Sequence, residues 1–258
     1  LPVLSVIFFG PVLEYAVASL VVARFVMTFM YFLLMNKRMS AHWLKEKNDY
    51  SNIKALWKFG AWITVSNVVG PLMVIADRFI ISSVLGAAVV AYYTIPLDSL
   101  IRMLIIPGAL TVALFPRITA LISVDLNAAK KLYSKATTIV TKVFAPILLV
   151  IALSSHVWLS VWLGVEFADK SWVIASILSI GIFFNGIAQI PHAVIQAKGD
   201  ARLTALIHLT EFALYIPLLF IAINYFGISR VAVVWVLRAI VDFIKLRTFT
   251  KNSLEVYL

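Results

Sequence analysis

Long apolar runs, separated by short polar or glycine-containing connections, make up most of this chain. Most runs reach roughly 20 residues or more, the length at which an α-helix crosses the ~30 Å apolar core of a bilayer. They show no series of short strands with alternating apolar and polar residues, which disfavours a β-barrel. The pattern therefore predicts an all-α, polytopic transmembrane helix bundle.

The runs predict the tail of one helix at Leu1–Phe9, a full span at Val12–Met35 and six further spans. The six spans are predicted at Phe59–Leu85, Ala88–Ile122, Leu132–Leu163, Trp172–Ala197, Leu203–Phe226 and Val231–Lys245. The span from Ala88 is longer than a bilayer requires. We expect it to tilt and to bend at Pro96, Pro107 or Pro116.

A polar connection at residues 36–58 divides the chain into two parts. We expect it to be a cytoplasmic linker between two lobes. Residues 1–35 would then supply the last one to two helices of an N-terminal lobe, and residues 59–258 would form a six-helix C-terminal lobe. Because the chain starts with Leu inside an apolar run, we expect it to lack the preceding helices.

Composition supports this class: the 258 residues are 62% hydrophobic and only 13% charged, far from the balance of a soluble domain. The net charge of +10 lies in short connections without a basic-aromatic module, so we expect no nucleic-acid partner. Sixteen of the 22 basic residues fall on one side of the predicted spans, whereas the other side holds only Lys170 and Arg230. The positive-inside rule then places the linker and the C-terminus in the cytoplasm.

Charged residues inside the apolar runs are the candidate functional groups, because a charge at bilayer depth costs at least a few kcal/mol. If Phe59–Ile122 folds as a hairpin at Gly86–Ala87, two acids and two arginines meet at one level. These four are Asp77, Arg78, Asp98 and Arg102. A second group forms around a bend at Gly227, with Glu211 and Asp242 equidistant from it and Arg238 one helical turn from Asp242.

Two interpretations of these groups remain open. They are either structural ion pairs that fix helix register, or ligands of a transport path. Together with Arg24, the arginines offer permanent charge and forked donors for an anionic substrate, whereas the four acids offer sites for a coupling proton or sodium ion. Asn67, Asn185 and Gln189 fit either a cavity lining or hydrogen bonds between helices.

Motifs for enzymatic chemistry are not found, so the sequence predicts no catalytic residue and no cofactor. His192 and His208 are equidistant from a turn at Gly199–Asp200 and are expected to approach each other. A zinc-type site needs a third ligand, and no carboxylate is in register near them, so we predict no metal. The absence of cysteine excludes disulfides and thiol catalysis.

The stretches WITVSNVVGPLMVIADRFIISSVLG and AYYTIPLDSLIRMLIIPGALTVALFPRI resemble the Wzx-type O-antigen and polysaccharide flippases, in the multidrug/oligosaccharidyl-lipid/polysaccharide exporter superfamily. The resemblance extends through HAVIQAKGDARLTA. It implies two six-helix lobes around a central cavity, ion-driven alternating access and a multi-pass position in the bacterial inner membrane with a cytoplasmic C-terminus. The family's arginine-lined cavity would correspond here to Arg24, Arg78, Arg102 and Arg238.

The resemblance implies a flippase that moves lipid-linked oligosaccharides for lipopolysaccharide synthesis. The polyprenyl tail of the substrate would stay in membrane lipid while its pyrophosphate meets the arginines. A multidrug or cation antiporter of the same superfamily is an alternative, although four acids balanced by four arginines favour an anion. A membrane glycosyltransferase or polymerase is disfavoured because the outer loops are short. A purely structural membrane protein would not need so many intramembrane charges.

Overall fold

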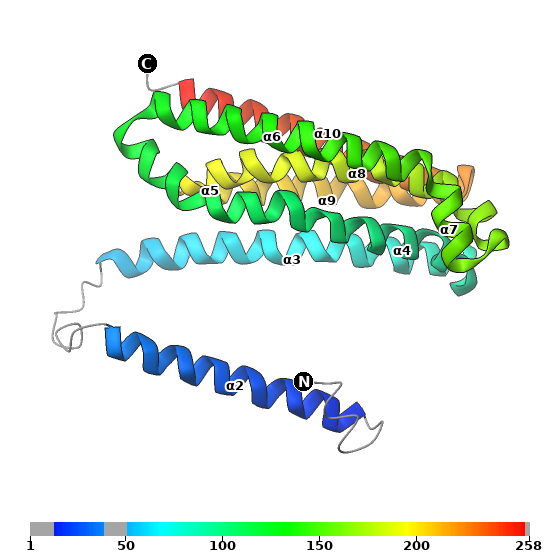
Figure 1. Ribbon diagram of the computed structural model, residues 1–258, viewed down its shortest axis with the longest axis horizontal. Helices are drawn as coiled ribbons and strands as arrows, with labels where there is room; N and C mark the ends of the chain where they lie inside the picture. The colour runs from blue at the N-terminus through cyan, green and yellow to red at the C-terminus, as the bar shows by residue number, and fades with distance from the viewer. Residues whose placement is uncertain (1–12, 39–50, 256–258) are drawn as a thin grey trace. The chain divides into compact units, whose positions relative to one another are not determined.

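The computed structural model describes residues 13–38 and 51–255, and all of its regular elements there are helices (Figure 1). The chain divides into two compact units, Leu1–Ile53 and Lys54–Leu258. The first unit contains the apolar helix α2, Leu13–Arg38, which presents nearly all of its described side chains to its surroundings. The predicted helix end at Leu1–Phe9 and the middle of the predicted linker lie outside the described residues.

The second unit is a bundle of antiparallel helices. Its elements are α3 Ser51–Leu85, α4 Ala87–Ile101, η2 Arg102–Leu104, α5 Ile105–Val124, α6 Leu126–Leu153, α7 Ser155–Leu163, α8 Val165–Ala197, α9 Ala201–Phe226 and α10 Ile228–Glu255. Counting α2, six spans in the described residues are long and apolar enough to cross a membrane. These features confirm the all-α polytopic class. Helix α10 has 28 residues, sufficient for a span, but is not among these six.

Glycines lie where the chain turns between helices, including the bends predicted at Gly86, Gly199 and Gly227. Gly86, Gly164, Gly199 and Gly227 all have φ between 76° and 90°, a region that costs other residues strain. Aspartates begin two of the helices: Asp125 accepts a hydrogen bond from the Ala128 N–H at 2.9 Å, and Asp200 accepts one from the Leu203 N–H at 3.1 Å. The turn chemistry in the sequence thus sets where these helices start and stop.

The long span after Gly86 is interrupted, as predicted, but at the 3₁₀ turn Arg102–Leu104 rather than at a proline itself. Pro107 lacks the N–H that would bond to the carbonyl of Met103, so the helix tightens just before it. A second prediction needs correction. Residues Leu132–Leu163 do not form one span, because α6 begins earlier, ends at Leu153, and is followed by the separate short helix α7.

Helix α8 is the most buried span and packs against α4, α5, α6, α7 and α10 (Figure 1). Two glycines allow this close approach. A Cβ built on Gly181 would collide with the Trp235 ring of α10, and one on Gly186 would lie 2.5 Å from Phe144 Cε1 of α6. The resulting core runs along the bundle through Phe144, Leu178 and Ile182. This packing leaves a cavity on one side of α8 and a groove on another.

Candidate functional site

A cavity of about 410 Å³ lies between α3, α5, α8, α9 and α10, within the apolar bundle. Three of the eight predicted charged residues line it: Glu211 from α9, and Arg238 and Asp242 from α10. Positions 238, 242 and 246 of α10 face the cavity because residues three to four apart share one side of a helix. The cavity therefore brings together the second of the two predicted charge groups.

The acids of the cavity are incompletely satisfied. Glu211 is 4% exposed, and its Oε1 lies 3.4 Å from Lys245 Nζ. Glu211 Oε2 and Asp242 Oδ1 are buried and have no hydrogen-bond partner among the described residues. A buried carboxylate oxygen without a donor costs free energy unless it binds a proton, a cation or water. Both positions are therefore chemically suited to bind a small cation.

Arg238 is held by aromatic and sulfur contacts. Its guanidinium carbon lies 5.4 Å from the Tyr215 ring centroid and 5.6 Å from that of Trp235, and its Nη1 lies 3.2 Å from Met73 Sδ. Within the described residues it has no carboxylate within 4 Å. These soft contacts orient the guanidinium without neutralising its charge, so Arg238 remains available to an anion in the cavity.

The predicted polar residues also meet here. His192 and His208 line the cavity and stack with ring centroids 5.7 Å apart, as their distances from the Gly199 turn predicted. Asn185 and Gln189 line the same cavity, whereas Asn67 is exposed on α3 and does not. No group of three potential metal ligands occurs in the described residues.

Asp77 lies in α3, one to two turns from the cavity-lining Met73 and Gly70, and is completely buried. Its two oxygens accept hydrogen bonds from the Tyr215 hydroxyl at 2.7 Å and the Tyr93 hydroxyl at 3.0 Å. Because Arg238 lies over the Tyr215 ring, a contiguous chain of contacts joins Asp77 to the cavity. Neither tyrosine is among the site residues predicted from the sequence.

The hairpin group does not assemble as predicted. Arg78 pairs with Asp98, and both side chains are nearly half exposed. Asp77 turns away from them into the core, and Arg102 is exposed in the 3₁₀ turn with no ion pair to any described residue. The four charges therefore lie in three different surroundings: a half-exposed ion pair, the buried core and an exposed turn. The expectation of one four-residue cluster is wrong.

Arg24 belongs to the other unit. It is exposed near the middle of α2, and its carbonyl accepts a hydrogen bond from the Thr28 hydroxyl at 2.8 Å. Its predicted role in a shared path stays a prediction.

Comparison with known proteins agrees with this architecture. A family model described as "Polysaccharide biosynthesis protein" matches residues 5–172. The chain belongs to the polysaccharide biosynthesis protein family. A protein of Shigella flexneri named "Putative O-antigen transporter" is 34% identical over 260 residues, which cover 97% of this chain. Together these matches confirm the resemblance to Wzx-type flippases.

The chain spans 59% of the length of that relative. No solved structure matches this chain significantly. Membership of the family and the six apolar spans identify a multi-pass membrane protein.

Proposed function

We propose that this family member moves a lipid-linked oligosaccharide across the bacterial inner membrane, with the pyrophosphate of the substrate passing Arg238 in the cavity. The observation that carries the proposal is the Arg238 guanidinium, which lines the cavity and has no described carboxylate oxygen within 4 Å, although Glu211 and Asp242 line the same cavity. A charge within the bilayer costs several kcal/mol of free energy unless it faces an anion or a water-filled cavity. The relative named for O-antigen transport supports this choice of substrate.

The other three predicted arginines are weaker candidates than Arg238 for contact with the pyrophosphate. Arg102 has no ion pair among the described residues, and its neighbours Ile101 and Leu104 line the cavity, so it is the second candidate for contact with the pyrophosphate. Arg78 contributes only when it leaves Asp98. Arg24 would act from the other unit.

Coupling to a proton or sodium gradient is assigned to the acids. Glu211 and Asp242 each keep a buried oxygen without a donor in the described part of the bundle, and both line the cavity with Arg238. Binding of a cation there would change the field at Arg238 and hence its attraction for phosphate. Asp98 and Asp77 would contribute through Arg78 and Tyr215 respectively.

Complementation tests the proposal. The intact protein is expressed in a host that lacks its own polysaccharide flippase and supplies the matching repeat unit. The proposal expects surface polysaccharide to return, and lipid-linked repeat units to stop accumulating at the inner leaflet. A host that regains drug resistance but no surface polysaccharide would instead identify a multidrug exporter.

A further inference from the structure

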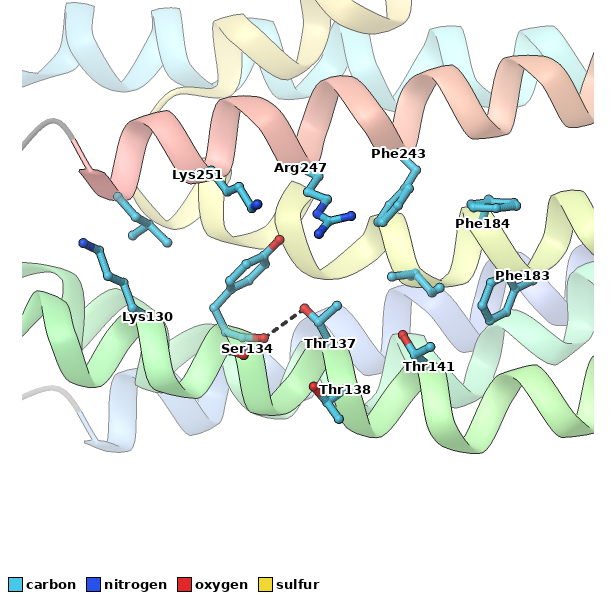
Figure 2. Close-up of a pocket in the computed structure, with 13 residues that line it drawn as sticks. Lys130, Ser134, Thr137, Thr138, Thr141, Phe183, Phe184, Phe243, Arg247 and Lys251 are labelled. Atoms are coloured by element: carbon cyan, nitrogen blue, oxygen red, sulfur yellow. Dashed lines mark hydrogen bonds between the residues drawn. The ribbon is translucent and has the colours of Figure 1, made fainter.

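A second hollow lies on another side of α8, apart from the cavity described above. It is a groove of about 560 Å³ between α6, α8 and α10, and we call it the α6–α10 groove (Figure 2). On α10 its lining residues are Phe243, Arg247, Lys251 and Leu254, a stripe spaced by three to four residues. The stripe of the central cavity lies on a different face of the same helix, so one helix lines two distinct sites.

The groove is cationic, and none of the described residues that line it is acidic. Lys130, Arg247 and Lys251 line it, and none of the three forms an ion pair with a described residue. Three like charges around one hollow repel one another unless an anion lies between them. The guanidinium of Arg247 lies 5.9 Å from the Phe243 ring centroid, which directs it along the groove rather than toward a carboxylate.

Hydroxyl groups line the α6 wall. They come from Tyr133, Ser134, Thr137, Thr138 and Thr141, again at helical spacing. Thr137 donates to the Tyr133 carbonyl at 2.9 Å, but the hydroxyls of Ser134, Thr138 and Thr141 make no hydrogen bond within the described structure. Hydroxyl donors beside three cations are the groups that bind phosphate oxygens.

The groove changes character along its length. Figure 2 shows Lys130 and Lys251 at one end, Arg247 next, and then the rings of Phe243, Phe184 and Phe183 farther along the same gap. The Phe184 and Phe243 rings lie with centroids 5.8 Å apart. Lys130 is near the start of α6 and Lys251 near the end of α10, so the charges lie at the bundle end that the basic-residue distribution assigns to the cytoplasm.

We infer that the α6–α10 groove binds the diphosphate head of a single-chain polyprenyl lipid from the cytoplasmic leaflet. Three cations match the multiple charges of a diphosphate better than the single charge of a common phospholipid. One row of phenyl rings leads from the head site toward bilayer depth and suits one apolar chain. The polyprenyl identity rests on the proposed function, whereas the diphosphate follows from the groove itself.

The test measures binding rather than transport, so its result is separable from that of the complementation experiment. The intact protein is purified in detergent and titrated calorimetrically with farnesyl diphosphate, a short soluble probe. Lys130→Gln, Arg247→Gln and Lys251→Gln are combined in one groove variant. The control variant combines Lys131→Gln, Lys135→Gln and Lys142→Gln, three exposed lysines of α6 that do not line the groove.

We expect the groove variant to bind farnesyl diphosphate about a hundredfold more weakly, because each basic residue near an anionic head group contributes roughly a factor of five and the three factors multiply. The control variant, with the same net charge, should differ from the unmodified protein by less than about twofold. If the combined groove variant does not accumulate, the single Arg247→Gln variant at an exposed position still predicts about fivefold weaker binding.

Other results overturn the inference. Equal binding by the groove variant places the diphosphate elsewhere, and an equal loss in the control variant means non-specific charge attraction. Dioctanoyl phosphatidylglycerol binding as tightly as farnesyl diphosphate, with the same loss, would identify an ordinary phospholipid site. Inorganic pyrophosphate binding as tightly as farnesyl diphosphate would show that the phenyl rings hold no chain.

Discussion

The buried carboxylate of Asp77 supports a quantitative prediction about stability. Asp77 is 0% exposed, and its Oδ1 accepts a 2.7 Å hydrogen bond from the Tyr215 hydroxyl of α9. Tyr215→Phe removes that donor without changing the ring over which Arg238 lies. Because the oxygen is left buried without this partner, the free energy of unfolding should fall by about 1–3 kcal/mol.

Tyr225 provides the matched control, since it lies on the same helix and is 79% exposed. Tyr225→Phe should change the free energy of unfolding by less than about 0.5 kcal/mol. The assay is reversible unfolding in mixed micelles of increasing denaturing detergent, followed by tryptophan fluorescence of the intact protein. The transition midpoint and its slope are compared between variants.

A double-mutant comparison isolates the hydrogen bond itself. In an Asp77→Ala background the acceptor is absent, so Tyr215→Phe should cost at least about 1 kcal/mol less than it does in the unmodified protein. If Tyr215→Phe is indistinguishable from Tyr225→Phe, or if its cost is the same in both backgrounds, the hydrogen bond between Tyr215 and Asp77 does not stabilise the fold.

Three further predictions concern the ion pair, the helix packing and the topology. Asp98 should show a coupling free energy of about 0.5–1 kcal/mol with Arg78 but none with Arg102, since only Arg78 contacts it. The measurement is unfolding of Asp98→Asn, Arg78→Gln, Arg102→Gln and the double variants, and coupling to Arg102 would contradict the structure. Gly186→Ala should lower the free energy of unfolding by about 1–3 kcal/mol, because the new methyl group would push against Phe144. Gly60 has open space around it, so Gly60→Ala should not lower the free energy of unfolding. Equal effects of the two changes would refute the close packing of α8 on α6. Reporter fusions at Asn127 and Asp200 should report the cytoplasm and fusions at Gly164 and Gly227 the outer side, because of the basic-residue distribution; a reversed signal at any site would refute the assignment.

The fold was largely predictable because its main determinants are local. Apolar length marks the helices, and Gly86, Gly164, Gly199 and Gly227 mark the turns, since only glycine takes their positive φ without strain. The division of α6 from α7 was missed because the polar stretch at residues 154–156 is short and apolar residues resume directly after it. The 3₁₀ turn at Arg102 appeared near, but not at, the expected proline because the missing N–H acts on the preceding turn.

The sequence predicted the level of the candidate site residues along the hairpin, but not the direction in which their side chains point. Counting residues from a hairpin bend gives the level of Arg78 and Asp98, and they do pair. The rotation of α3 about its axis depends on packing against helices distant in the sequence. The burial of Asp77 between Tyr93 and Tyr215 therefore could not be predicted by counting residues from the bend. The α6 hydroxyl stripe in the α6–α10 groove was visible as a helical spacing, but its partner residues on α10 are more than 100 positions away in the chain.

The proposed transport function depends on contact between Arg238 and the phosphate of the substrate inside the cavity. The most direct measurement is surface polysaccharide per molecule of membrane protein, in a flippase-deficient host that expresses the intact protein. Arg238→Gln removes the charge from the cavity, and Arg230→Gln is the control, because it removes an exposed charge from the first turn of the same helix. We predict that Arg238→Gln lowers polysaccharide per molecule at least about tenfold, as expected when a buried charge-assisted contact is lost. Arg230→Gln should leave it unchanged. Normal surface polysaccharide per molecule in Arg238→Gln would show that Arg238 does not bind the phosphate during transport.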